Sequence, residues 1–98
     1  MDERNFRKFL ENSTYKGKKY TEKAIVSRIA KAKKAQELLN NTLDNIVSND
    51  SKMFDALNIL QKNENPAHNP MQNALRKYYE FKNGKEFPKK SKYNQNNN

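Results

Sequence analysis

The feature that most constrains the fold is the stretch from Glu22 to Leu39, which neither glycine nor proline interrupts. At the spacing of an α-helix its apolar side chains share one narrow sector, which consists of Ile25, Ile29, Ala32 and Leu39. The opposite side is basic and polar, and it carries Lys23, Ser27, Lys31 and Lys34. Thr21 precedes the stretch as an N-cap. We therefore expect a long helix with one buried apolar face and one exposed basic face.

A shorter helix is expected over residues 2–12, because Phe6, Phe9 and Leu10 recur at helical spacing there. The following segment, 13–19, interrupts this pattern, and we expect it to form a loop. No run in the chain alternates apolar and polar side chains as a half-buried strand would. The first fifth of the chain therefore predicts one helix and one loop.

The second half of the chain predicts a helical turn and two further helices. Thr42 is placed to cap a single turn, and Ser51 to cap the helix that follows. The last helix has the clearest boundaries, with Asn69 as its cap, Pro70 in its first position and Gly84 at its end. We expect its inward face to consist of Met71, Ala74, Leu75 and Tyr78, with Tyr79 and Phe81 at the margins.

These patterns predict an all-α fold of four to five helices in one domain over residues 1–87. Residues 88–98 contain almost no side chains to bury, and we expect them to form a disordered, basic tail that is dispensable for folding. A chain of 98 residues buries only a modest share of its surface. The domain should therefore be of marginal stability.

The charge of the chain is strongly positive, with a formal net charge of +9. It is also uneven, because residues 41–60 hold one lysine against three aspartates and the basic excess lies on both sides of this segment. An uneven basic field suits a polyanion, with nucleic acid first and an anionic membrane surface second. The same balance also occurs in basic proteins of a Lys- and Asn-rich proteome.

The reactive side chains argue against an enzyme. Cysteine is absent, His68 is the only histidine, and the two glycines stand too far apart for a phosphate-binding loop. We therefore expect no catalytic residues, no metal and no cofactor, and an exposed His68 that caps a helix or contacts a phosphate. No apolar run is long enough to cross a membrane, and Met1–Phe6 has no signal-peptide core, so we expect a cytoplasmic protein.

The order of the expected elements follows a known pattern of a Thr-led basic helix, a turn around an acidic-Ile motif, a third helix, and a last helix with Leu-Arg before aromatic residues. The corresponding segments here are Thr21-Glu22-Lys23-Ala24-Ile25, Thr42-Leu43-Asp44-Asn45-Ile46, Ser51–Leu60 and Asn73-Ala74-Leu75-Arg76-Lys77-Tyr78-Tyr79-Glu80-Phe81. Over residues 4–83 the chain resembles the SAM-like, core-binding N-terminal domain of tyrosine recombinases, the phage integrase family.

The resemblance implies an orthogonal bundle that clamps one face of duplex DNA through its first long helix and its last helix. It does not include the domain that carries the catalytic Arg, His and Tyr of the family, so it implies neither cleavage nor joining. Pro70 departs from the family, which often has a DNA-facing polar residue there. Related domains also occur beside nucleases or as stand-alone parts of mobile elements.

We therefore expect a stand-alone module, from a phage or another mobile element, that contacts duplex DNA. The expected contact residues are Lys16, Lys18, Lys19, Lys23, Ser27, Lys31, Lys34, Asn73, Arg76 and Lys77. The alternative is a protein-interaction module, such as a phage-encoded inhibitor of a host protein, whose partner presents an acidic surface. DNA binding requires the basic faces of the long and last helices to lie in one plane, whereas an interaction module requires an exposed apolar patch.

Overall fold

The computed structural model of the chain describes residues 1–93, and these contain five α-helices, one small hairpin and a 3-10 turn. In chain order the elements are α1 (Glu3–Glu11), β1 (Thr14–Tyr15), β2 (Lys18–Lys19), α2 (Glu22–Leu39), α3 (Leu43–Val47), α4 (Asp50–Asn63), α5 (Pro70–Asn83) and η1 (Lys90–Lys92). The predicted all-α fold is confirmed, and all the expected helices are present.

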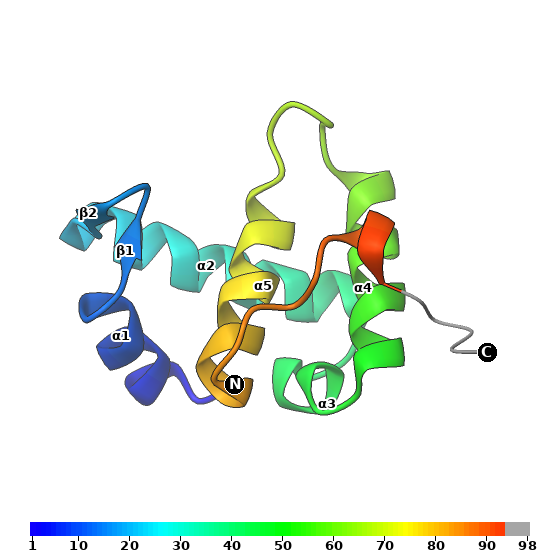
Figure 1. Cartoon of the computed structure of the whole chain (residues 1–98), viewed down its shortest axis with the longest axis horizontal. Helices are drawn as coiled ribbons and strands as arrows, with labels where there is room; N and C mark the ends of the chain where they lie inside the picture. The colour runs from blue at the N-terminus through cyan, green and yellow to red at the C-terminus, as the bar shows by residue number, and fades with distance from the viewer. Residues whose placement is uncertain (94–98) are drawn as a thin grey trace.

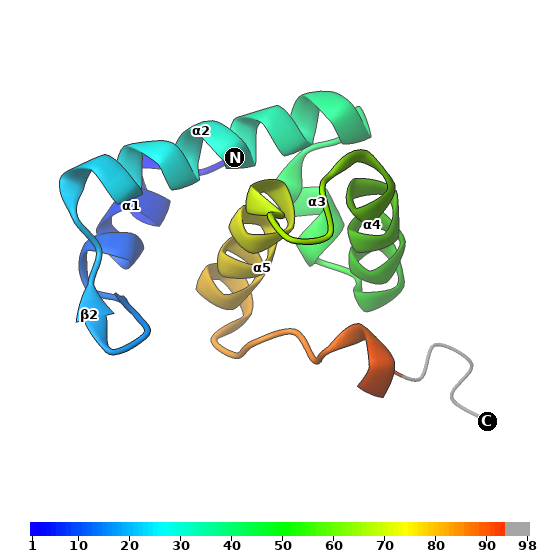
Figure 2. The same ribbon diagram turned by 90° about the horizontal axis from the view of Figure 1, so that it is seen from above.

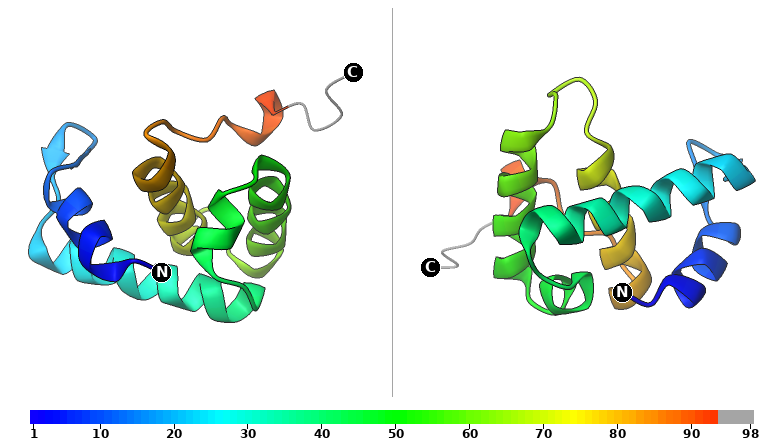
Figure 3. Two further views of the ribbon diagram at one scale, coloured as in Figure 1. Left: turned by 90° about the horizontal axis from the view of Figure 1, so that it is seen from below. Right: turned by 180° about the vertical axis from the view of Figure 1, so that it is seen from behind.

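The long helix α2 crosses α4 and α5 and forms one side of the molecule (Figures 1 and 2). It packs chiefly against α5, while α1 and the hairpin lie against its N-terminal half and α3 joins its end to α4 (Figure 3). The segment after α5 runs along the opposite side of the α4–α5 pair (Figure 2). The bundle therefore presents two separate faces, one formed by α2 and the other by the C-terminal segment.

One apolar core joins all five helices, and the predicted apolar stripes contribute to it. Ile25 and Ile29 of α2 are buried as expected, whereas Leu39 is only partly buried at the end of the helix. Tyr79 was expected at the margin of α5, but it is buried, because its ring packs on Phe87. Its hydroxyl donates a hydrogen bond to an Asp50 carboxylate oxygen at 2.8 Å, which satisfies the polar end of the ring.

The helices begin with side chains that accept hydrogen bonds from free backbone N–H groups. Thr21 and Thr42 cap α2 and α3 as predicted. The predicted cap of α4 at Ser51 is wrong: Asn49 takes that position, and its side-chain oxygen accepts from Lys52 N at 2.9 Å. An asparagine caps as well as a serine, so the helix begins two residues earlier than predicted.

Helix α5 begins at the predicted residue, but its free N–H groups are capped by a side chain that was not predicted. Asn69 holds the cap position and Pro70 the first turn, but the Asn69 side chain makes no capping hydrogen bond. The Glu64 carboxylate instead accepts from Met71 N at 2.6 Å and Gln72 N at 3.0 Å. A carboxylate at this end also suits the positive helix dipole, so the preceding loop caps the helix from a distance.

The expected loop over residues 13–19 contains a β-hairpin, in which Thr14 pairs with Lys19 and Tyr15 with Lys18. Its two-residue turn places Lys16 at φ 53° and Gly17 at φ 80°. Positive φ at both central positions is the geometry of a turn that joins strands tightly, and glycine adopts it at little cost. The strands have only two residues each, too few to show alternation in the sequence.

Ordered structure extends beyond the predicted domain boundary at Pro88. Residues 90–92 form η1, and the ring of Tyr93 stacks on Phe54 of α4 with centroids 4.9 Å apart. It also contacts Phe87, which is itself buried. The predicted tail is therefore wrong for residues 88–93, because aromatic side chains pack this segment onto the bundle; the remaining five residues, 94–98, lie outside the described part of the chain.

Candidate nucleic-acid interface

A row of connected hollows runs along one side of α2. It begins between the hairpin and the start of α2, passes the N-terminal half of α5, and ends at the loop between α4 and α5. Neighbouring hollows share lining residues, so they form one continuous depression. We call this surface the basic groove, and its principal lining residues are Tyr15, Lys16, Lys18, Lys19, Ser27, Arg28, Lys31, Lys34, His68, Pro70 and Asn73.

The basic groove concentrates cations that have no acidic partner. Six of them line it, and the exposed Lys23 stands beside it on α2. None of the seven forms an ion pair within residues 1–93; they are Lys16, Lys18, Lys19, Lys23, Arg28, Lys31 and Lys34. Glu64 lines the far end of the groove, but its carboxylate already accepts two N–H groups of α5.

Four cations elsewhere on the described chain are paired with carboxylates: Arg7, Lys33, Lys77 and Lys82. Arg7 contacts Glu22 in an ion pair that ties α1 to α2, and Lys33 pairs with Glu3 at 2.7 Å between the same helices. Lys82 lies 3.4 Å from Asp44. The groove side of α2 therefore carries seven cations without an ion pair, while other cations without one, such as Arg4, Lys8 and Lys62, lie on the remaining surface of the described chain.

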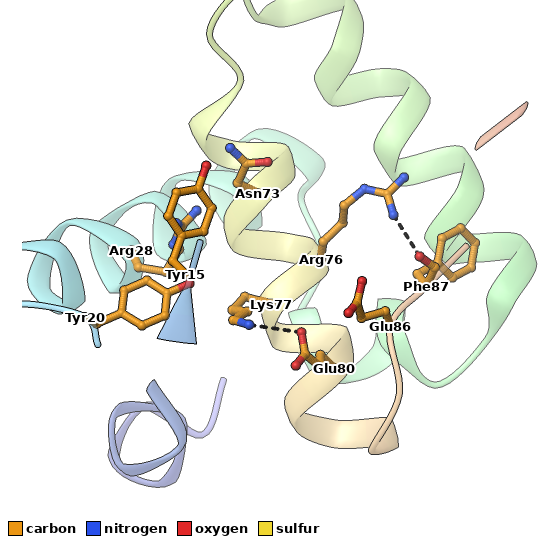
Figure 4. Close-up of a pocket in the computed structure, with 9 residues that line it drawn as sticks. All are labelled: Tyr15, Tyr20, Arg28, Asn73, Arg76, Lys77, Glu80, Glu86 and Phe87. Carbon is orange, nitrogen blue, oxygen red and sulfur yellow. Dashed lines mark hydrogen bonds and ion pairs between the residues drawn. The ribbon is translucent and has the colours of Figure 1, made fainter. Parts of the chain in front are cut away.

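Arg76 was predicted to contact DNA, but the structure engages it in the fold. Its guanidinium donates to the carbonyl oxygens of Phe87 at 3.0 Å and Pro88 at 3.2 Å, as Figure 4 shows for Phe87. Burial lowers the pKa of Arg76, and the nearby Glu86 partly offsets this. Because these carbonyls belong to the C-terminal segment, Arg76 holds that segment against α5 instead of facing the groove.

Lys77 was also predicted to contact DNA, and it too is occupied by neighbours. Its ammonium lies 3.1 Å from a Glu80 carboxylate oxygen (Figure 4) and packs near the rings of Phe9 and Tyr20. Only 17% of the Lys77 side chain is exposed. Asn73 lines the basic groove itself, whereas Arg76 and Lys77 line an adjoining hollow that shares Tyr15, Arg28 and Asn73 with the groove.

Arg28 is a central residue of the groove that the sequence analysis missed. It lines two of the connected hollows and the adjoining one beside Arg76 and Lys77, and its guanidinium carbon lies 5.8 Å from the ring centre of Tyr15 and 5.6 Å from that of Tyr20. Its position one helical turn before Lys31 was the available signal. It lies between the apolar and basic sides of α2, so the packing of α5 and the hairpin decides which way it faces.

The loop between α4 and α5 brings His68 into the same groove. His68 is exposed and forms a backbone hydrogen bond to Asn65 at 2.9 Å, which closes the loop. It lies beside Lys31 and Pro70 in two adjoining hollows. The sequence analysis had considered a phosphate contact for this histidine but had not placed it in the site, because the loop carries no periodic signal.

The apolar surface of the bundle is limited. Exposed large apolar side chains among the described residues are Tyr15, Val26, Leu38 and Ile59, spread over the hairpin, α2 and α4. Residues 1–93 include no helix with the length and apolar character that a membrane span requires. They also bring no three His, Asp or Glu side chains together as a metal site would need.

No protein-family model, curated protein or solved structure matches the chain. The integrase-like resemblance consequently remains a hypothesis based on short motifs. The positions and charges of the groove residues are what support a function for this chain.

Proposed function

We propose that the chain binds duplex DNA, with little base preference, through the basic groove. The observation that carries this proposal is the row of seven cations without acidic partners, which extends from the hairpin along α2. Lysine and arginine side chains that meet phosphates release the counterions of DNA, and this release dominates non-specific affinity. The role is one of binding, because the groove offers cations and short polar groups rather than a nucleophile with a neighbouring base.

The spacing of these cations fits a duplex. From Lys23 to Lys34 the axis of α2 rises about 16 Å, which corresponds to about five base pairs of B-DNA. Ser27 lies between these lysines, and Asn73 faces them from α5. Hydroxyl and amide groups of this kind hydrogen-bond phosphate oxygens and position a protein on the duplex.

The proposal modifies what the integrase resemblance implied. In a SAM-like clamp both the long helix and the last helix would contact DNA. Here α2 and the hairpin supply the cations, and α5 contributes Asn73 and Pro70 at the groove. Arg76 and Lys77 of α5 are instead engaged in contacts within the protein. We propose a stand-alone module of a phage or other mobile element that grips DNA mainly through α2.

Salt dependence of duplex binding tests the proposal. With about five phosphate contacts, the logarithm of the association constant should fall against the logarithm of the salt concentration with a slope near −4 to −5. The triple variant Lys23→Ala/Lys31→Ala/Lys34→Ala should make this slope shallower by up to about 3, because each missing contact releases fewer counterions. Fluorescence anisotropy with a labelled random-sequence duplex measures both slopes.

A matched control separates groove contacts from net charge. The double variant Lys33→Ala/Lys82→Ala removes lysines of the same kind that are paired with carboxylates outside the groove. It should change the slope by less than about 0.5. An absence of binding at low salt, or an equal effect of both variants per lysine removed, would contradict the groove proposal.

The second candidate function is a protein-interaction module, and one observation favours it. A hollow between the end of α2 and α4 is lined by Leu39, Ile46, Ala56 and Ile59, and Ile59 is 45% exposed. An apolar depression with a charged rim suits a protein partner. If the duplex experiment fails, we expect a protein partner instead. Its acidic surface would bind the basic groove, and its apolar residues would pack into this hollow.

A further inference from the structure

The hairpin holds an aromatic cluster at one end of the basic groove. The rings of Tyr15 and Tyr20 lie 6.3 Å apart at an interplanar angle of 41°. The Arg28 guanidinium lies close to both rings, and the Lys16 ammonium lies 5.4 Å from the Tyr15 ring centre. Figure 4 shows Tyr15 and Tyr20 side by side with Arg28 next to them. The ring of Tyr15 is thus held by cations and a second ring.

Tyr15 is also unusually open for an aromatic side chain in this bundle. It is 49% exposed, whereas Tyr78 and Tyr79 of α5 are buried. It lines two hollows of the groove and the adjoining one beside Arg76 and Lys77, and the hollow between the hairpin and the start of α2 has a volume of about 460 Å³. The ring therefore offers a flat apolar face to solvent beside a hollow, and the Arg28 guanidinium packs near the same ring.

The charge around this ring identifies the ligand that would cover it. Lys16, Lys18 and Lys19 surround the hollow between the hairpin and α2, and no carboxylate lines it; Glu80 and Glu86 line only the adjoining hollow on the α5 side of the ring. A flat, apolar ligand with flanking negative charges meets these conditions, and a nucleotide has both parts. Single-stranded DNA is commonly held this way, with bases stacked on aromatic rings and phosphates on cations.

We propose that Tyr15 stacks on an unpaired base of the bound DNA, so that the protein favours a duplex that ends in, or contains, an unstacked nucleotide. This rests on the proposed function, in which the duplex lies in the groove along α2; the hairpin stands at the N-terminal end of α2 (Figure 1) and lines that end of the groove. A base inside a duplex has both faces covered by its neighbours. Only an unpaired or flipped base presents a face to Tyr15.

Three DNA ligands of one sequence test this inference. They are a blunt duplex, the same duplex with a short single-stranded overhang, and that duplex with an overhang of abasic deoxyribose units. The two overhangs have the same phosphates, so a difference between them reports base contacts alone. The base-containing overhang should bind more tightly than the abasic one by about 5- to 150-fold, the range that stacking of a base on an aromatic ring supports.

Two variants assign the preference to the ring. Tyr15→Ala should bring the base-containing and abasic overhangs to equal affinity. Tyr15→Phe, the matched control, retains the ring and should retain the preference. Because the chain contains no tryptophan, quenching of its tyrosine fluorescence by the base-containing overhang gives an independent signal that Tyr15→Ala should reduce.

The outcomes separate this inference from the proposal on which it rests. Binding of the blunt duplex together with equal affinities for both overhangs would overturn the stacking role of Tyr15 and leave duplex binding in place. A preference that persists in Tyr15→Ala would overturn it as well. Failure of all three ligands to bind at low salt would overturn duplex binding, and the stacking role with it.

Discussion

At the scale of single residues, arginines at similar positions on amphipathic helices differ in what they contact: one faces the groove, and another is hydrogen-bonded within the fold. Arg28 and Arg76 both lie on amphipathic helices, but Arg28 faces the groove whereas Arg76 donates two hydrogen bonds to backbone carbonyls of the C-terminal segment. A guanidinium supplies several donors in a fixed geometry, so it can hold two carbonyls at once. The same residue type therefore stabilises the fold at one position and, under the proposed function, would contact DNA at the other.

Arg76→Ala tests the structural role of this residue. We expect the free energy of unfolding to fall by about 1 to 3 kcal/mol, because two carbonyls lose a charged donor and the Phe87 ring loses the guanidinium packed near it. Urea unfolding monitored by circular dichroism measures this loss. Lys23→Ala, an exposed control, should change stability by less than about 0.5 kcal/mol. A slope of duplex binding against salt that becomes shallower by about 1 in Arg76→Ala would show instead that Arg76 contacts phosphate.

At the scale of elements, the short helix α3 is held in place by α5. The Tyr78 hydroxyl donates to Asp44 at 2.5 Å and accepts from Asp2 N–H at 2.8 Å, so it links α3, α5 and the start of α1. The Met1 amino group lies 3.3 Å from the same carboxylate. A single helical turn is not stable alone, and these long-range contacts give it a fixed position.

The Asp44 carboxylate predicts a pH dependence of stability. Burial raises its pKa, but the hydrogen bond from Tyr78 and the nearby Met1 ammonium outweigh this and hold the pKa below the ordinary value of 3.8. A group with a lowered folded-state pKa stabilises the fold above its unfolded pKa and loses this contribution as the pH falls through the folded value. The stability difference between the parent and Asp44→Asn should therefore be constant above about pH 5 and shrink below about pH 3.8.

Urea unfolding of both proteins across this pH range measures the difference. Tyr78→Phe removes the donor, so in that background the effect of Asp44→Asn should be smaller, as expected for two residues that interact directly. A difference that stays constant as the pH is lowered would contradict the role assigned to the Asp44 carboxylate.

The apolar face of α2 gives a second prediction at this scale. Ile29→Ala should lower the free energy of unfolding by about 2 to 4 kcal/mol, because it leaves a cavity in a small core. Val26 lies on the same helix but is 51% exposed, so Val26→Ala should cost less than about 0.5 kcal/mol. Thermal unfolding of both variants makes the comparison, and equal melting temperatures would show that the assigned helix face is wrong.

At the scale of the whole molecule, the basic groove proposed for DNA binding and the aromatic contacts of the C-terminal segment lie on different sides of the bundle. The basic groove follows α2, and the aromatic cluster of Phe54, Phe87 and Tyr93 fastens the C-terminal segment on the other side of α4 and α5 (Figure 2). A small bundle gains stability by closing its open side with aromatic rings. The aromatic contacts that hold the C-terminal segment therefore do not involve the lysines of the basic groove.

Tyr93→Ala tests the separation of the two faces. The loss of two aromatic contacts should lower the free energy of unfolding by about 1 to 3 kcal/mol and leave the salt dependence of duplex binding unchanged. Differential scanning calorimetry and anisotropy titrations give the two readouts. Lys92→Ala, at the neighbouring exposed position, serves as the control. Unchanged stability in Tyr93→Ala would restore the view that this segment is dispensable.

Local patterns were enough to predict most of the helices. The helical spacing of apolar residues placed α1, α2 and α5 close to their observed bounds, because each stripe must be buried against neighbours. The spacing also put Lys23, Lys31 and Lys34 on the polar side of α2. The hairpin and the aromatic C-terminal segment escaped prediction, because a strand of two residues and an isolated aromatic pair have no period to detect.

The sequence by itself therefore determined the fold class, the amphipathic faces and the excess of positive charge, since all three follow from residue types and their spacing along one helix. Only the tertiary structure decided which cations remain without partners. Arg76 resembles Arg28 in sequence, but its guanidinium lies near carbonyls contributed by the C-terminal segment. Packing between distant parts of the chain sets those distances, and no local spacing encodes them; the ion pair of Lys77 with Glu80, by contrast, joins residues three apart on α5.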